Sequence, residues 1–301
     1  MLTTGRFAPS PTGSLHFGSL VAATASYLAV RQQGGKWLLR IEDLDKPREQ
    51  PGAANHIIQT LHAYGFEWDD EILFQNQRIP AYHEALAYLQ AHTYPCYCSR
   101  KHIQQQGHAG EYGWVYPGTC RQQPHVPSKH QHAIRVRTHD QPICFTDAVR
   151  GEYCQDLQSE LGDFVILRAD GLFAYQLAVV VDDAFQGINQ VVRGADLLDN
   201  TPRQIYLQQL LGLPQPAYAH IPLAANAQGQ KLSKQNLAPA IDTHSRVKTL
   251  VACLHFLGQP CPAAHEFPDT TTLWDWGIAN WNMALVPKIH TQPCNKNGLT
   301  P

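Results

Sequence analysis

Two segments that lie far apart in the chain carry residues able to bind phosphate groups. In Arg6-Phe-Ala-Pro-Ser-Pro-Thr-Gly-Ser-Leu-His16-Phe-Gly18-Ser19, a histidine and a glycine stand where a loop enters a predicted helix. The N-terminus of a helix offers unpaired N–H groups and the positive end of its dipole, which suits an anionic phosphate. His16 could donate to a phosphate oxygen, and Gly18 would let a nucleotide approach the backbone closely. Taken alone, His-x-Gly is common, and a helix-capping role for His16 is the simpler interpretation.

The second segment is Lys231-Leu-Ser-Lys234-Gln235, which follows Asn226-Ala-Gln-Gly-Gln. Two lysines three residues apart in a loop flanked by glycine can hold a triphosphate and neutralise its leaving group. A solvated basic loop is the ordinary interpretation of such a pair when nothing else supports it. The two segments together favour a nucleotide site to which both contribute.

A strand–helix–strand unit is predicted to position the first of these segments. Residues 3–8 read as a strand, and the prolines and glycine at positions 9–13 favour a turn. A helix over 18–33 ends at Gly34-Gly35, and residues 36–42 read as a second buried strand. A connection of this kind joins parallel strands, so we expect an α/β fold with a Rossmann-type parallel sheet.

Further elements follow from the same patterns of apolar and polar residues. Helices are predicted over 53–64, 79–92, 201–211, 239–257 and 272–285, with Thr201 as an N-cap and Pro202 in the first turn. Strands are predicted over 133–137, 143–149, 164–167 and 190–193, and residues 172–181 have buried strand or helix character. The stretch 94–132 is rich in Cys, Gly and Gln and is predicted to be irregular.

Composition limits the class of protein. The chain has 301 residues, of which 44% are hydrophobic, which is enough for about two domains. The longest apolar stretch, Leu20 to Val30, is too short to cross a bilayer, and the chain does not open with a signal sequence. We therefore expect a soluble cytoplasmic protein without a membrane or an obligate protein partner. The net charge of −2 weakly opposes a nucleic-acid partner, although Arg100, Lys101, Arg121, Lys129 and Arg135 could form a local basic face.

Three of the eight cysteines, Cys96, Cys98 and Cys120, cluster in the irregular stretch and indicate a metal site. Three thiolates with one nitrogen or oxygen ligand suit a tetrahedral Zn²⁺. The candidates for the fourth ligand are His102, His108, His125 and Tyr116. A chain of this length has no need of disulfides, so the other five cysteines are predicted to be buried apolar residues. They are Cys144, Cys154, Cys253, Cys261 and Cys294.

The two phosphate-binding segments resemble the "HIGH" and "KMSKS" signatures of class I aminoacyl-tRNA synthetases, with departures at Leu232 and Gln235. The form Arg-Phe-Ala-Pro-Ser-Pro-Thr-Gly resembles the glutamyl/glutaminyl branch of that class, and the likeness extends over about residues 3–240 in family order. The resemblance implies that His16, Gly18, Ser19, Lys231 and Lys234 bind ATP with Mg²⁺. It assigns the catalytic roles to His16, Gly18, Lys231 and Lys234.

The same resemblance implies a pocket for L-glutamate, whose two carboxylates call for arginines and whose ammonium calls for an anion. It assigns Arg193, Tyr175 and Glu42 to this pocket, with Leu44 departing from the usual threonine near Glu42. It also assigns the first-loop residues Arg6, Phe7, Ala8, Pro9 and Ser10. Asp182 and Asp183 are expected to orient the site rather than to bind metal.

Only about 65 residues follow Gln235, which leaves no room for the anticodon-binding domain of a complete glutamyl- or glutaminyl-tRNA synthetase. The chain therefore resembles the glutamyl-Q tRNA(Asp) synthetase family, whose members activate glutamate without tRNA and attach it to queuosine in the anticodon of tRNA(Asp). This family also implies Tyr116 as the fourth ligand of a structural zinc. The implied organisation is a split catalytic domain (1–75 and 173–238), an acceptor-type insertion with the zinc site (76–172) and a short helical, stem-contact-like region (239–301).

Three other functions fit part of the pattern. A glutamyl-tRNA synthetase would charge the 3′ end of a tRNA, but the missing anticodon domain argues against it. A small-molecule ligase or nucleotidyltransferase could share the His-x-Gly loop, but the pocket of Arg6, Glu42, Tyr175 and Arg193 makes it a poorer fit. A regulatory binder without activity is opposed by the presence of His16, Gly18, Lys231 and Lys234.

Overall fold

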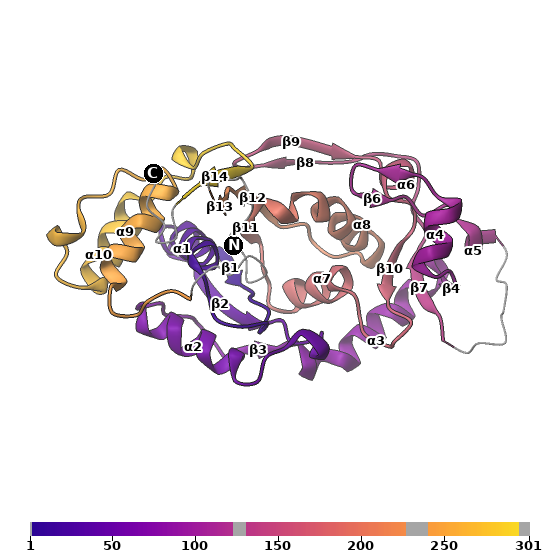
Figure 1. Ribbon diagram of the computed structural model, residues 1–301, viewed down its shortest axis with the longest axis horizontal. Helices are drawn as coiled ribbons and strands as arrows, with labels where there is room; N and C mark the ends of the chain where they lie inside the picture. The colour runs from indigo at the N-terminus through magenta and orange to yellow at the C-terminus, as the bar shows by residue number, and fades with distance from the viewer. Residues whose placement is uncertain (1, 123–130, 227–239, 295–301) are drawn as a thin grey trace.

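A seven-stranded sheet runs through the centre of the protein, whose computed structural model describes residues 2–122, 131–226 and 240–294 (Figure 1). The strand order is β3 (Leu73–Phe74), β2 (Lys36–Ile41), β1 (Thr4–Phe7), β11 (Gln190–Gly194), β12 (Ala217–Ile221), β8 (Ile143–Asp147) and β9 (Gly151–Gln155). Every neighbouring pair is parallel except the β8–β9 hairpin. The prediction of an α/β fold with a mostly parallel sheet is confirmed.

The predicted strand–helix–strand unit is β1, α1 (Phe17–Arg31) and β2. Helix α1 packs against β1, β2 and β11 because most of its side chains are small or apolar and buried. The order β3-β2-β1-β11-β12 is that of a doubly wound sheet, in which the direction of winding reverses between β1 and β11. Sheets of this kind bind ligands at the carboxyl ends of the two strands on either side of the reversal.

The remaining helices agree closely with the predicted ones. They are α2 (Ala53–Ala63), α3 (Ile79–Tyr88), α7 (Tyr175–Phe185), α8 (Thr201–Leu211), α9 (Arg246–Phe256) and α10 (Thr270–Asn280). Short 3₁₀ helices are η1 (Lys46–Arg48), η2 (Gln75–Arg78), η3 (Leu89–His92), η4 (Ala195–Asn200), η6 (Ala264–Glu266) and η7 (Met283–Leu285). None of the helices in the described residues is both long and apolar enough to span a membrane.

Two details of the predicted helices are wrong. Thr201 is the first residue of α8 rather than its N-cap, a position that Asn200 takes without a capping side chain. The Thr201 hydroxyl is engaged elsewhere, because it accepts a hydrogen bond from the Arg193 guanidinium at 2.8 Å. The helix predicted from residue 239 begins only at Arg246, and residue 239 itself lies outside the described residues.

The stretch predicted to be irregular contains regular elements. They are β4 (Thr93–Cys96), α4 (Arg100–Gln106), β5 (Ala109–Gly110), β6 (Gly113–Trp114) and α5 (Thr119–Gln122). Strand β4 pairs with β7 (Ala133–Val136), which pairs in turn with β10 (Phe164–Leu167), and α6 (Leu157–Glu160) lies close by in the chain. These strands, α4 and α5 form one end of the molecule, and α9 and α10 form the other (Figure 1). Hairpin β8–β9 falls within the interval predicted as an insertion, yet it extends the central sheet.

An aromatic cluster joins the C-terminal helices to the first half of the sheet. Trp274 of α10 lies 4.8 Å from Phe66 and 4.9 Å from Tyr27 between ring centroids, and both of these rings contact Trp37 of β2. The indole N–H of Trp274 donates to the carbonyl of Tyr64. Near the chain end, β14 (Thr291–Pro293) pairs in parallel with β13 (Leu223–Ala225), which follows β12. The C-terminal region therefore shares its core with the sheet.

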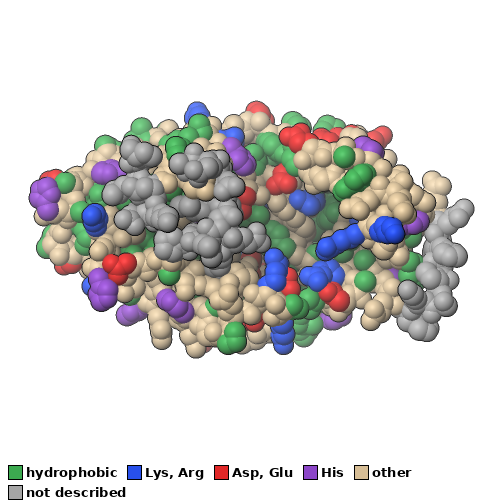
Figure 2. Space-filling model, viewed as in Figure 1, with side chains coloured by type: hydrophobic (Ala, Val, Ile, Leu, Met, Phe, Trp, Pro, Cys, Tyr) green, Lys and Arg blue, Asp and Glu red, His purple; other side chains and the backbone are tan. Residues whose placement is uncertain are grey.

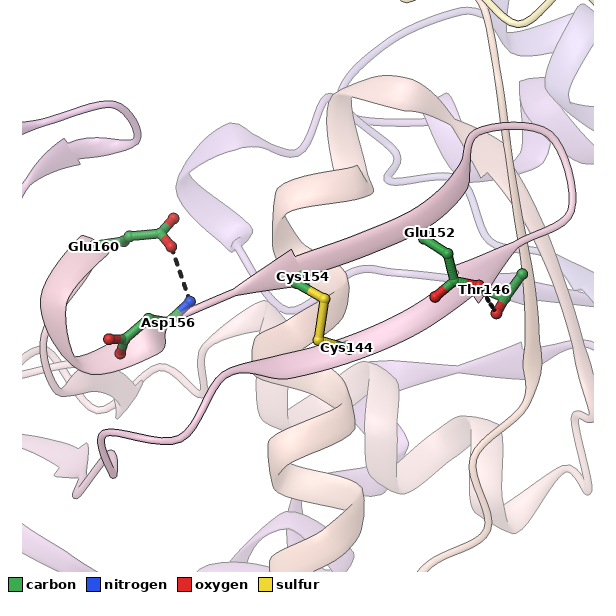
Figure 3. Close-up of a disulfide and its surroundings, with 6 residues drawn as sticks. All are labelled: Cys144, Thr146, Glu152, Cys154, Asp156 and Glu160. Atoms are coloured by element: carbon green, nitrogen blue, oxygen red, sulfur yellow. Dashed lines mark hydrogen bonds between the residues drawn. A yellow bond between two sulfur atoms is a disulfide. The ribbon is translucent and has the colours of Figure 1, made fainter.

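Two of the five cysteines predicted to be buried apolar residues are instead exposed and disulfide-bonded. Cys144 of β8 and Cys154 of β9 face each other across the hairpin and form a disulfide (Figure 3). Both side chains lie on the exposed face of the hairpin, opposite the face that carries the buried residues Ile143, Phe145 and Asp147. The prediction holds for Cys253, Cys261 and Cys294, which are buried free thiols.

Candidate active site

A cavity of about 990 Å³ opens at the carboxyl ends of β1 and β11, where the winding of the sheet reverses. The eleven predicted ATP- and glutamate-binding residues that lie in the described part of the chain all line it, namely Arg6, Phe7, Ala8, Pro9, Ser10, His16, Gly18, Ser19, Glu42, Tyr175 and Arg193. Lys231 and Lys234 lie outside the described residues. Lys and Arg side chains gather beside a hollow near the middle of the face shown in Figure 2.

The N-terminus of α1 faces this cavity. His16 is its N-cap, and the imidazole Nδ1 accepts the backbone N–H of Ser19 at 3.3 Å. Gly18 makes room for this ring, since a Cβ at that position would lie 3.3 Å from His16 Cε1 and 3.6 Å from the Ala224 methyl group. Both interpretations of the sequence motif therefore hold geometrically, because His16 caps the helix and also borders the cavity.

A buried network of charges forms the wall on the side of β1 and β2. Asp183 of α7 accepts hydrogen bonds from Nε of Arg6 at 3.1 Å and from Nη2 of Arg40 at 2.7 Å. Burial opposes ionisation of Asp183, but the two arginines hold the pKa of its carboxyl below the ordinary value. The expectation that Asp183 orients the site agrees with this geometry, because it fixes the guanidinium of Arg6 at the cavity wall. Arg40 was missed at the sequence level, although it stands two residues before Glu42.

Glu42 lies on the same wall, and its protonation state decides what this part of the cavity can bind. Its buried Oε1 lies 3.6 Å from Nη2 of Arg40, an ion-pair distance, and has no hydrogen-bond partner among the described residues. Burial raises the pKa of Glu42 to about 7, although Arg40 and Arg6 act in the opposite direction. A buried carboxylate oxygen without a donor is costly unless a ligand supplies one. Glu42 is therefore suited to receive a cationic group of a ligand.

Arg193 at the end of β11 forms the opposite wall. Its guanidinium donates to His220 Nε2 at 3.0 Å, to Thr201 Oγ1 at 2.8 Å and to the Leu197 carbonyl at 3.4 Å. Nη1 also lies 3.3 Å from the Tyr175 hydroxyl. No carboxylate of the described residues pairs with this guanidinium, which is only 5% exposed. A buried cation without an anion is unfavourable, so the site is suited to a carboxylate from a ligand.

His220 and Asp147 hold Arg193 from behind and were not recognised in the sequence. The imidazole Nδ1 lies 2.6 Å from Asp147 Oδ2, and both side chains are fully buried. Burial lowers the pKa of His220 to about 4, and the neighbouring Arg193 acts in the same direction. Asp147 ends a strand that was predicted, but the strand that carries His220 was not, so their meeting could not be anticipated.

Charged residues at the mouth of the cavity were also missed. Arg48 and Arg168 line it, and both pair with Asp45, at 2.6 Å and 3.6 Å. Both arginines are exposed, at 74% and 44% of their side chains. Exposed pairs of this kind contribute little to stability, so these cations remain available to a partner outside the cavity.

The predicted metal ligands converge at the far end of the molecule. The sulfur atoms of Cys96, Cys98 and Cys120 all lie within 4.8 Å of one another. The Tyr116 hydroxyl lies 3.4 Å from the sulfur of Cys96 and 3.9 Å from that of Cys98. Burial raises the pKa of Cys98 to about 12, and its neighbours Cys120 and Cys96 act in the same direction. Three crowded thiols of this kind ionise together only when a cation binds among them.

Comparisons with known proteins agree with this architecture. The family model of class I tRNA synthetases (E and Q), catalytic domain, matches residues 3–267. Two solved structures share the fold, a glutamate tRNA ligase from Elizabethkingia meningosepticum in complex with its amino acid (TM-score 0.81) and a glutamate-tRNA synthetase from Elizabethkingia anophelis (TM-score 0.80). Each is 23% identical to this chain and covers 99% of it, while the match covers 68% and 69% of those chains. The fold and the site thus define a class I tRNA synthetase catalytic domain of the glutamate and glutamine type.

More similar relatives narrow the assignment within that class. The glutamyl-Q tRNA(Asp) synthetase of Neisseria meningitidis serogroup A is 55% identical over 95% of this chain and 97% of its own length. That of Thiobacillus denitrificans is 53% identical over 94% of both chains. The chain belongs to the glutamyl-Q tRNA(Asp) synthetase family, and with it to the ATP-dependent ligases.

Proposed function

We propose that this protein uses ATP to convert L-glutamate to glutamyl-adenylate without tRNA, and then transfers the glutamyl group to queuosine in the anticodon of tRNA(Asp). One observation supports this most directly. The cavity at the switch point has a buried cation without an anion at Arg193 and a carboxylate oxygen without a donor at Glu42. A small molecule with a carboxylate at one end and an ammonium near the other satisfies both. The reaction is placed in the cytoplasm, where tRNA and ATP are found.

Glutamate takes its orientation from three groups in this proposal. The side-chain carboxylate binds Arg193 and the Tyr175 hydroxyl, which lie 3.3 Å apart. The ammonium binds Glu42, and Arg6, with Phe7, Ala8, Pro9 and Ser10 of the same loop, borders the α-carboxylate. Arg6 keeps its geometry because Asp183 binds it from the other side.

In this proposal ATP binds at the N-terminus of α1, where His16, Gly18 and Ser19 line the cavity. Lys231 and Lys234, which lie outside the described residues, are proposed to bind its phosphates. A glutamate carboxylate oxygen attacks the α-phosphorus, the bond to the β-phosphate bridging oxygen breaks, and pyrophosphate leaves. Mg²⁺ accompanies the nucleotide and offsets its charge. A hydroxyl of the queuosine cyclopentene-diol then attacks the acyl carbon, AMP leaves with the bonding electrons, and the hydroxyl proton passes to solvent. Positioning and charge suffice, so no covalent protein intermediate is needed.

A structural Zn²⁺ is proposed for Cys96, Cys98, Tyr116 and Cys120, in an insertion over 76–172 between the catalytic segments 1–75 and 173–238. The donors fit because the three sulfur atoms lie within 4.8 Å of one another and the Tyr116 hydroxyl lies 3.4 Å and 3.9 Å from two of them. Arg135 supports the same interpretation, since its Nε donates to the Cys96 sulfur at 3.2 Å and offsets part of the thiolate charge. Residues 239–301 form the short stem-contact-like region of this scheme.

Glutamate-dependent exchange of labelled pyrophosphate into ATP, measured without RNA, tests the first step. Exchange is expected with glutamate alone, and its absence, or a requirement for tRNA, would contradict the proposal. The second step is tested with labelled glutamate and tRNA whose 3′-terminal nucleotides have been removed by an exonuclease, which leaves the queuosine diol untouched. Labelling is expected to persist on this tRNA and to disappear with tRNA from a queuosine-free host. Labelling only of an intact 3′ end would instead indicate a glutamyl-tRNA synthetase.

A further inference from the structure

Two of the side chains that hold Arg193 in place, His220 and Thr201, do not line the cavity. A guanidinium has five N–H groups, all donors. Within the described residues, four of them already have acceptors: His220 Nε2, Thr201 Oγ1, the Leu197 carbonyl and the Tyr175 hydroxyl. The fifth, on Nη1, is left for a ligand beside Tyr175. The orientation of Arg193 therefore depends in part on His220 and Thr201, which lie behind the cavity.

The contact between Arg193 and His220 fixes the tautomer of the histidine. Nε of arginine can only donate, so His220 Nε2, 3.0 Å away, must accept and carries no proton. The single proton of the neutral ring then lies on Nδ1 and is donated to Asp147 Oδ2 at 2.6 Å. A protonated ring would place two N–H groups against each other, so the arrangement requires a neutral imidazole.

Asp147 is itself held in one orientation by the backbone. Its Oδ1 accepts the N–H groups of Val149 at 3.0 Å, Arg150 at 2.9 Å and His220 at 3.1 Å. Oδ2 is thereby directed to the imidazole of His220. A chain of hydrogen bonds therefore links Asp147 at the end of β8 to His220 of β12, and His220 to Arg193 near the end of β11.

We propose that Asp147 and His220 are positioning residues for glutamate. Asp147 holds His220 in the Nδ1–H tautomer, and His220 in this tautomer fixes Arg193 in the orientation that receives the side-chain carboxylate of the substrate. The inference rests on the proposed function, because it assumes that Arg193 meets this carboxylate. A purely structural role, in which the pair only fastens β8 to β12, predicts a loss of stability without selectivity for one substrate.

Two substitutions of His220 separate the two sides of its ring. In His220→Gln, the amide oxygen can reach the place of Nε2 and accept from Arg193. In His220→Asn, the shorter amide reaches only the place of Nδ1, so Asp147 keeps a partner and Arg193 loses one. We expect His220→Asn to raise the KM for glutamate about 10- to 100-fold, the usual effect of losing a hydrogen bond to a charged group. His220→Gln should stay within about threefold of the unmodified enzyme, and the KM for ATP should change by less than about twofold in both, because no ATP contact is altered.

Asp147→Asn provides a sharper test with almost no change of shape. The three backbone N–H groups will hold the amide oxygen at the place of Oδ1, which turns the NH₂ group toward His220 Nδ1. The imidazole must then carry its proton on Nε2, facing the N–H of Arg193. We expect the KM for glutamate to rise at least about tenfold, since two donors then face each other. In a His220→Gln background the same substitution should have little effect, because no tautomer remains to reverse.

The readouts are pyrophosphate exchange for both KM values, calorimetric titration of glutamate into each variant, and the thermal midpoint as a check on folding. Calorimetry tests the positioning role even if exchange fails, so failure of the proposed function and failure of this inference are distinguishable. A selective loss of glutamate binding in His220→Asn and Asp147→Asn, spared in His220→Gln, supports the inference. The inference is wrong if the folded Asp147→Asn variant binds glutamate normally, or if His220→Gln and His220→Asn lose glutamate binding equally. If Asp147→Asn does not fold, the two His220 variants decide the question.

Discussion

The two arginines of the cavity are stabilised in opposite ways. Arg6 lies in a network where Asp183 and Glu42 balance the charges of Arg6 and Arg40. Arg193 is equally buried, but its neighbours His220, Thr201 and Tyr175 are neutral, and among the described residues it has no ion pair. Burial alone therefore does not identify a ligand-binding cation. Arg193, which has no direct ion pair among the described residues, is the arginine that we propose to meet an anionic substrate.

Removing Arg193 should have the largest effect on glutamate use. Arg193→Gln takes away the cation that meets the side-chain carboxylate, at a cost of about 3–4 kcal/mol, or roughly 10²- to 10³-fold in kcat/KM for glutamate. The KM for ATP should change little. Pyrophosphate exchange measures both, and Lys36→Gln, which breaks an exposed pair with Asp70, is the matched control. A loss below about fivefold would contradict the assignment of Arg193.

Removing the charge of Asp183 should unbalance the network around Arg6 and act mainly on stability. Asp183→Asn leaves Arg6 and Arg40 buried with one carboxylate fewer, which should lower the free energy of unfolding by about 3 kcal/mol. The exposed pair of Lys36 and Asp70 supplies the control, since Asp70→Asn should cost below about 1 kcal/mol. Urea denaturation compares the two variants. Equal losses would show that the buried network is not what stabilises Arg6.

The protonation state of Glu42 should make the binding of glutamate depend on pH. Burial raises the pKa of Glu42 to about 7, so below that pH the free enzyme carries a neutral carboxyl that must lose its proton to meet an ammonium. The KM for glutamate should therefore rise about tenfold for each pH unit below 7 and level off above it. Exchange assays between pH 5.5 and about 8.5 measure this profile. Glu42→Gln should bind weakly at every pH, and an unchanged slope in that variant would exclude Glu42 as the cause.

Opening the disulfide of the β8–β9 hairpin should have the smallest effect on glutamate use. Cys144→Ser with Cys154→Ser removes a cross-link of sequence separation 10, which should lower the stability of the fold by up to about 2–3 kcal/mol. Asp147 at the end of β8 is also held by three backbone N–H groups, so the KM for glutamate should rise less than about threefold. A larger rise would mean that the hairpin itself controls Arg193.

The sequence predicted the parts of the site that lie next to each other in the chain. The loop from Arg6 to Ser19 and the strand ending at Glu42 could be placed, because a strand–helix–strand unit has one handedness and one ligand-binding edge. The supports behind Arg193 could not, because Asp147 and His220 are 73 residues apart and meet only through the pairing of β8 with β12. The exposed positions of Cys144 and Cys154 depend on the register of the hairpin, which apolar content alone does not fix. Lys231 and Lys234 were predicted to contribute to the nucleotide site and lie outside the described residues.

The aromatic cluster of Tyr27, Trp37, Phe66 and Trp274 has a consequence for engineering this scaffold. Trp274 belongs to the C-terminal helices, but its ring contacts lie with residues of the first 66 positions. The boundary expected near residue 239 is therefore a poor place to cut, since a chimera joined there would expose those rings and lose their packing. A foreign RNA-reading module is better appended after Pro301, because Cys294 is still part of this shared interior.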